Sequence, residues 1–125
     1  MLCDLTRTSA SRSRAMATLI LLNKAQMGHG DIALGARVLR NFLQKSVAIT
    51  DLEAIAFYNE GVRLAARDSA VATELTLLHD RGIDLMPCVT CVDHYGLRGR
   101  LCTERLSSME EIIDAMRKAN KVITL

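Results

Sequence analysis

The sequence predicts a three-layer α/β sandwich built on a mainly parallel sheet. Short apolar runs typical of strands alternate with longer segments of helical periodicity along residues 17–125. These strand-like runs are almost continuously apolar, which is typical of parallel strands that helices cover on both faces. Helices that connect successive strands imply parallel crossovers, which place the helices on the faces of the sheet.

The first predicted unit is a strand followed by a long helix. Residues 17–22 form a continuous apolar run, and residues 26–31 form a glycine-containing loop. Asp31 at the end of this loop is a suitable N-cap. A helix of about 14 residues follows from the apolar spacing. Its predicted inner stripe is Ile32, Ala36, Leu39 and Leu43.

The second unit repeats this pattern. A strand is predicted at 52–58, and the polar turn 59–61 ends it. A helix is predicted at 69–81, with Gly82 as its C-cap. The predicted inner stripe of this helix is Val71, Leu75 and Leu78.

The last two strands enclose the cysteine-containing segment. A third strand is predicted at 82–87, and the final strand at 121–125. Between them, residues 107–111 contain two overlapping capping boxes that open a helix. The predicted inner stripe of this helix is Met109, Ile112, Ile113 and Met116.

Two thiols in a C-x-x-C motif, Cys88 and Cys91, carry the predicted chemistry. They follow the third strand and precede residues that can turn helical, so we expect both sulfurs near a strand end and a helix N-terminus. Unpaired N–H groups and the helix dipole there favour a thiolate over a thiol. Such a thiolate can carry sulfur as a persulfide, pair with its neighbour or bind a metal.

Ligands of parallel sheets bind at the carboxyl ends of the strands, which here are followed by the loops 23–31, 58–63 and 88–97. The polar side chains of these loops are the candidate site-lining residues, because they are brought to one edge. They are His29, Tyr58, Asn59, Glu60 and His94. Either histidine is a candidate acceptor for a thiol proton.

Three other roles for the cysteines remain open. Cys88, Cys91, His94 and Cys102 are a possible zinc set, although no second C-x-x-C or H-x-x-H is present. A thioredoxin-like dithiol is the second alternative, but the motif comes late in the chain, after several alternating units. The third is a pair of inert core cysteines.

The composition of the chain argues against two classes of partner, nucleic acids and membranes. The chain has only four aromatic residues, too few for a base-stacking nucleic-acid surface. Its net charge of +2 comes from the first 16 residues, and the rest is balanced, so no nucleic-acid or membrane partner is predicted. No apolar run reaches the ~18–20 residues of a membrane span.

We expect residues 1–16 to be a disordered basic tail, because they are rich in Ser, Thr and Arg without apolar periodicity. They lack the apolar run of a secretory signal. Four cysteines in a chain of this size do not form a secreted disulfide framework, and a cytoplasmic protein is predicted.

Four groups of residues together resemble a known family. They are 27–31 with 34–35, 57–62 with Leu64, 88–91 with 95–97, and 109–112 with 121–123. In this order and spacing they resemble the DsrE/DsrF sulfur-relay superfamily, and within it the DsrE-like domain of YedF-type selenium-metabolism proteins. The resemblance covers residues 17–125, which we take as one DsrE-like domain.

The resemblance implies a DsrEFH-like sandwich with five parallel strands that assembles as a trimer or hexamer. It also implies a sulfurtransferase-like persulfide carrier without a cofactor, in which Cys88 carries the sulfur, Cys91 resolves it, and a separate TusA-like protein is the partner. Val89 departs from the family pattern, which has glycine there. The alternatives are a non-catalytic oligomeric scaffold of the same fold and a zinc-stabilised module.

Overall fold

The computed structural model describes residues 17–125, and the tail expected at 1–16 lies outside the described residues. Four parallel strands form one sheet in the order β3-β2-β1-β4, which confirms the predicted parallel arrangement. The strands are β1 (Thr18–Leu22), β2 (Leu52–Phe57), β3 (Asp84–Pro87) and β4 (Lys121–Thr124).

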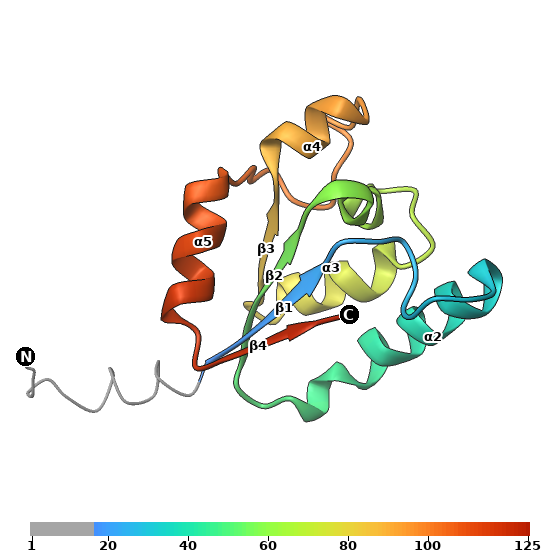
Figure 1. The fold of residues 1–125 in the computed structure, drawn as a ribbon, viewed down its shortest axis with the longest axis horizontal. Coiled ribbons are helices and arrows are strands. Elements are labelled where there is room, and N and C mark those ends of the chain that lie inside the picture. The colour runs from blue at the N-terminus through green and yellow to red at the C-terminus, as the bar shows by residue number, and fades with distance from the viewer. Residues whose placement is uncertain (1–16) are drawn as a thin grey trace, which may run out of the picture.

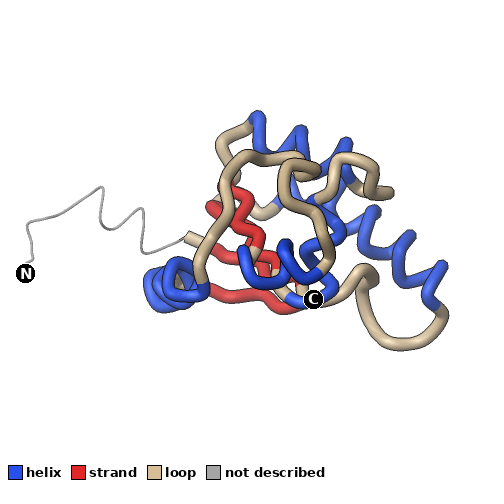
Figure 2. Tube along the Cα trace, turned by 90° about the horizontal axis from the view of Figure 1, so that it is seen from above, coloured by secondary structure: helices blue, strands red, loops and turns tan. Residues whose placement is uncertain are grey.

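Helices cover both faces of the sheet, so the predicted sandwich is confirmed. Helices α2 (Ile32–Lys45) and α3 (Ala72–Asp80) lie together on one face, and α5 (Met109–Lys118) lies on the other (Figure 1). Seen from above, the strands lie between these helices (Figure 2). The strand order explains why helices lie on both faces of the sheet. The chain adds β1, β2 and β3 side by side in one direction, and it then returns through α5 to the opposite edge of the sheet for β4.

The expectation of five strands is wrong, because the sheet has four within the described residues. The segment between α4 (Val89–His94) and α5 pairs with the end of β3 only through one bridge, between Cys88 and Ser107. Gly96 and Gly99 both have positive φ and turn the chain repeatedly in this segment. A segment that turns so often does not run alongside β3 long enough to form a ladder.

The first helix begins as predicted but buries a different stripe. The side chain of Asp31 caps α2 by accepting a hydrogen bond from the N–H of Leu34 at 2.8 Å. Leu39 and Leu43 are buried as predicted, whereas Ile32 is 70% exposed. The buried stripe instead starts at Gly35, because the preceding loop folds back onto that residue and leaves no room for a side chain.

Helix α5 also shows a confirmed start and a corrected stripe. Ser108 and Glu111 form the predicted capping box. Ile112 is buried, but Met109 and Ile113 are 43% and 54% exposed. The helix contacts the core through a neighbouring stripe that includes two alanines, and the larger side chains on either side are left outside. This stripe is Ile112, Ala115, Met116 and Ala119.

The predicted stripe of α3 is confirmed, since Val71, Leu75 and Leu78 are all buried. Two short 3-10 segments complete the fold, η1 (Ser46–Ala48) and η2 (Asn59–Ala65). None of the helices in the described part of the chain is long and apolar enough to cross a membrane.

Candidate functional site

The two thiols lie where β3 gives way to α4, at the carboxyl edge of the sheet. Cys88 follows the last residue of β3 and is the N-cap of α4, and Cys91 lies in the first turn of that helix. Their exposure differs sharply. Cys88 is 2% exposed and belongs to the hydrophobic core, whereas Cys91 is partly exposed. Only Cys91 is therefore placed to meet an external reactant in this conformation.

Cys91 lies in the wall of a pocket of about 430 Å³. Three separate parts of the chain form this pocket: the turn after β2, helix α4 and the first residue of α5. The residues around the thiol are mostly aromatic or apolar with a few polar groups, which is typical of a small-molecule site. They are Tyr58, Asn59, Thr90, His94, Tyr95 and Met109.

One backbone hydrogen bond is directed at the Cys91 sulfur. The N–H of Asn59 donates to Cys91 Sγ over 3.0 Å, across 32 residues of sequence. Asn59 has φ of 51°, and it is the only non-glycine residue with positive φ among residues 17–125. Asparagine tolerates this left-handed conformation better than most residues do. The conformation places an N–H donor where a negative sulfur would need one.

The turn that holds Asn59 is anchored to the end of β1. A Cβ atom on Gly61 would lie 2.0 Å from the carbonyl oxygen of Leu22, so only glycine fits there. The N–H of Tyr58 donates to the same Leu22 oxygen at 3.1 Å. The Tyr58 hydroxyl accepts a hydrogen bond from Asn23 Nδ2 at 3.1 Å. These contacts fix the donor toward Cys91.

The Cys91 thiol is less acidic than an ordinary cysteine. Burial raises the pKa of Cys91, the Asn59 N–H opposes this by stabilising the thiolate, and the adjacent Cys88 thiol raises the pKa further. The net direction is upward, opposite to the thiolate expected at a helix N-terminus. Desolvation in the wall of a largely apolar pocket, together with the Cys88 thiol, outweighs the stabilising N–H of Asn59.

The structure brings together three of the five predicted site-lining residues. Tyr58, Asn59 and His94 line the thiol pocket, and Glu60 lines the neighbouring cavity. His29 is exposed in its loop and lines neither of these two cavities. Its predicted role therefore has no geometric support.

Sequence reasoning missed other residues of the pocket. Tyr95 follows Cys91 by four residues, the spacing that places two side chains on one side of a helix, so this signal was present in the sequence. The sequence did not indicate that Met109 lines the pocket, because only the packing of α5 brings this residue to the Cys91 thiol. Tyr95 also contacts His94 edge-to-face, with ring centres 5.0 Å apart.

The proposed zinc ligands do not converge. Within residues 17–125, no three His, Cys, Asp or Glu side chains lie close enough together to hold a metal ion. Cys102 lies elsewhere, with its sulfur 3.7 Å from the carbonyl oxygen of Ala66 and 4.0 Å from that of Ala72. The geometry of these residues thus does not fit a tetrahedral site.

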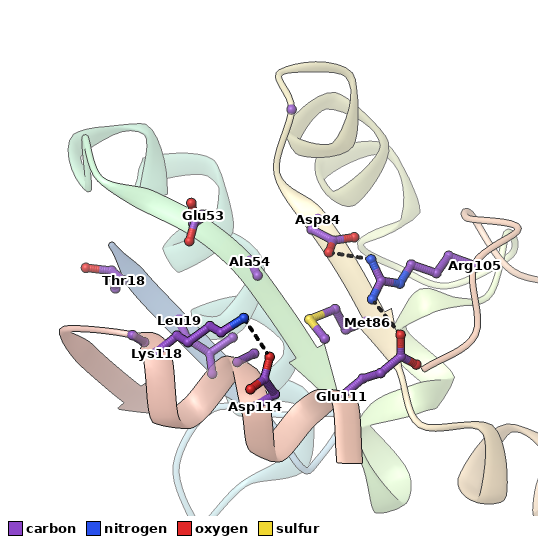
Figure 3. Close-up of a pocket in the computed structure, with 13 residues that line it drawn as sticks. Thr18, Leu19, Glu53, Ala54, Asp84, Met86, Arg105, Glu111, Asp114 and Lys118 are labelled. Atoms are coloured by element: carbon purple, nitrogen blue, oxygen red, sulfur yellow. Dashed lines mark hydrogen bonds and ion pairs between the residues drawn. The ribbon is translucent and has the colours of Figure 1, made fainter. Parts of the chain in front are cut away.

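Another hollow, of about 450 Å³, lies beside α5 toward the amino ends of the strands (Figure 3). Arg105 spans it, with ion pairs of 2.7 Å to Asp84 and 3.2 Å to Glu111. Lys118 pairs with Asp114 at 3.0 Å on the same helix. No cysteine lines this hollow, and the two candidate thiols lie at the opposite edge of the sheet.

The sequence matches the DsrE/DsrF-like family over residues 4–125. The chain belongs to this family. DsrE-like membership agrees with a fold of the sulfur-relay type, whereas the YedF-type subtype stays a prediction. A search among curated proteins finds no match.

Solved structures share the DsrE-like fold. YchN from E. coli superposes with a TM-score of 0.68 at 18% identity, covering 88% of this chain and 99% of its own. MTH1491 from Methanobacterium thermoautotrophicum gives 0.66 at 16% identity, over 87% and 98% of the two chains. BT1422 from Bacteroides thetaiotaomicron gives 0.62 at 17% identity, over 90% and 97%. At these identities the likeness shows the fold alone.

Proposed function

We propose that this DsrE-like protein handles sulfur by carrying it as a persulfide on its cysteine pair, with Cys91 as the thiol that meets the donor. The single observation that carries the proposal is the placement of the Cys91 sulfur, partly exposed in a pocket and facing the Asn59 N–H. The sequence-based prediction gives the carrier role to Cys88. Because Cys88 is 2% exposed, we assign it the second, resolving role.

The proposed transfer is a thiol exchange at sulfur. The Cys91 thiolate attacks the outer sulfur of a donor persulfide, a new S–S bond forms on Cys91, and the donor leaves as a thiolate. An acceptor thiolate then takes the outer sulfur and returns Cys91 to its thiolate form. His94 lines the pocket and is our candidate acceptor for the Cys91 proton.

Cys88 offers a second outcome for the same intermediate. If its thiolate attacks Cys91 Sγ, hydrosulfide leaves and a Cys88–Cys91 disulfide forms, which external thiols must reduce before the next cycle. Cys88 is the N-cap of α4 and Cys91 lies in the first turn of the same helix, so the two thiols are close in the chain and in the fold. In this proposal the protein is a cytoplasmic homo-oligomer with no cofactor, its acceptor is a TusA-like carrier, and selenium is an alternative cargo.

Mass spectrometry of single-cysteine variants tests the proposal. All variants carry Cys3→Ser and Cys102→Ser, so that only the pair can react. After incubation with a sulfane donor, we expect a mass increase of about 32 Da, one sulfur atom, on Cys91. Cys91→Ser should lose this adduct. Cys88→Ser should keep the adduct on Cys91 and should release less hydrosulfide than the protein with both cysteines.

Two other results have clear meanings. An adduct that is lost only in Cys88→Ser would return the carrier role to Cys88 and refute our assignment of Cys91. The absence of any adduct in the folded protein would contradict sulfur carriage altogether and leave the non-catalytic scaffold.

A further inference from the structure

A larger cavity lies directly beside the thiol pocket. It has a volume of about 710 Å³ and is formed by the loop after β1, by η2 and the residues after it, and by Tyr95 and Leu97 beyond α4. Tyr95 lines both cavities, so its ring is the wall between them. A molecule that fills the larger cavity therefore ends next to the pocket of Cys91.

Arg63 is the only Lys or Arg that lines either cavity within the described residues. Its guanidinium lies over the Tyr95 ring, 5.9 Å from the ring centre, which holds the charge close to the shared wall. The side chain is 58% exposed, and its contact with Glu60 is long, at 3.8 Å. Arg63 thus keeps donors available for an incoming carboxylate.

The same cavity also offers negative charge. One oxygen of Glu60 accepts a hydrogen bond from the N–H of Ala25 at 3.2 Å, which fixes this carboxylate at the cavity wall. Asp68 lines the cavity as well and forms no ion pair with the residues from 17 to 125. One cation and two carboxylates match a ligand that carries both a carboxylate and an ammonium group.

We propose that this cavity binds the body of a low-molecular-weight thiol persulfide of the amino-acid or short-peptide class. Arg63 pairs with its carboxylate, and the acidic side chains face its ammonium group. The ligand sulfur reaches Cys91 past Tyr95. This inference rests on the proposed function and names the class of donor for the same site. Transfer then leaves the donor as a free thiolate while Cys91 gains the outer sulfur.

Thiol–disulfide exchange tests this inference without requiring persulfide transfer. The protein carries Cys3→Ser, Cys88→Ser and Cys102→Ser, so that Cys91 is the only thiol. Its reaction with glutathione disulfide, which carries both carboxylate and ammonium groups, is compared with that of neutral 4,4′-dithiodipyridine. We expect the rate with glutathione disulfide to saturate as its concentration rises, because a complex forms before the exchange.

Arg63→Gln is the decisive variant, and Arg67→Gln is its matched control, because Arg67 is also exposed but lines a different cavity. We expect Arg63→Gln to raise the half-saturating concentration of glutathione disulfide by about 1.5- to 5-fold, as for an exposed ion pair. The limiting rate and the reaction with the neutral disulfide should stay within about twofold, and Arg67→Gln should change neither.

Three other outcomes overturn the inference. A linear rate without saturation excludes a binding cavity. An equal loss with both disulfides shows that Arg63 acts on the fold, and an equal effect of Arg67→Gln shows long-range charge alone. If charge selectivity appears but no persulfide ever forms on Cys91, the cavity assignment survives and the proposed function fails.

Discussion

The backbone N–H of Asn59 points at the sulfur of Cys91 over 3.0 Å, although the two residues come from different strand–loop units. This contact joins the turn after β2 to the helix after β3. Asn59 has φ of 51°, and its N–H points at the sulfur only while the turn keeps this left-handed conformation. The reactivity of the thiol and the conformation of the turn are therefore coupled.

The first prediction concerns the relative reactivity of the two thiols. Cys91 should react with iodoacetamide about tenfold faster than Cys88 or more, because a buried thiol reacts only when the structure opens locally. Peptide mapping after brief labelling measures both rates in one sample. Equal labelling of Cys88 and Cys91 in the native protein would contradict the difference in burial, provided that the two thiols also react equally in denaturant.

The second prediction is the pH dependence of Cys91. Because burial raises its pKa, the alkylation rate should rise with pH through a midpoint above the value of about 8.5 for a free cysteine. Cys88→Ala should move this midpoint to lower pH, since the neighbouring thiol contributes to the upward shift.

The same shift has a consequence for stability. The folded protein holds the Cys91 proton more tightly than the unfolded chain does, so the free energy of unfolding should fall as pH rises from the unfolded to the folded pKa. Denaturant titrations between neutral and alkaline pH measure this slope. In Cys91→Ser the contribution is gone, and an unchanged slope there would show that other groups cause the loss.

The third prediction concerns the conformation of Asn59. Asn59→Gly keeps the backbone donor and accepts positive φ, so it should change the free energy of unfolding by only a few tenths of a kcal/mol. Asn59→Val should cost about 1–2 kcal/mol, because a β-branched residue is strained in this region. Denaturant unfolding of both variants decides this, and equal costs would argue against strain.

The fourth prediction uses two glycines with different surroundings. Gly61→Ala should destabilise by about 1–3 kcal/mol, because its Cβ would meet the Leu22 carbonyl at 2.0 Å. Gly28→Ala is the control, since it has φ of +83° but nothing within 4 Å of the new Cβ, and should cost only about 1 kcal/mol of backbone strain. We also expect Gly61→Ala to slow the alkylation of Cys91, because it disturbs the turn that holds the Asn59 N–H. This slowing should be smaller at high pH than at neutral pH, because the Cys91 thiolate forms there without that donor.

The fifth prediction concerns the contact between α2 and α3. Glu74 is almost buried, and one of its oxygens accepts hydrogen bonds from Gln44 at 3.0 Å and Arg40 at 3.2 Å. Burial alone would raise the pKa of Glu74, but these donors outweigh it and lower the pKa. The resulting stabilisation is present above the unfolded pKa of about 4.3 and is lost as pH falls through the folded value.

Glu74→Gln should therefore destabilise by about 1–2 kcal/mol at neutral pH and by much less in acid. The control is Glu104→Gln, because Glu104 is exposed and forms no ion pair with any residue from 17 to 125. Unfolding free energies at several pH values provide the measurement. A difference that is constant with pH would rule out the charged form as its cause.

The local features of this chain could be predicted because they depend on neighbours in sequence. The cap at Asp31, the capping box of Ser108 and the alternation of apolar runs with helices all act within one turn or one strand. The position of the C-x-x-C motif at a strand end follows from the same local pattern. The family match rests on sequence as well, since it spans residues 4–125.

Tertiary packing decided the rest. Cys88 is buried in the core, whereas Cys91 lines a pocket. The sequence cannot show this difference, because it depends on how α4 packs against the sheet. The Asn59 donor and the Met109 wall reach Cys91 from distant segments, and desolvation by that assembly raises a pKa that the helix N-terminus alone would lower. The sequence thus predicted which pair of thiols forms the candidate site, whereas the packing of the folded chain decided that Cys91 is partly exposed and Cys88 is buried.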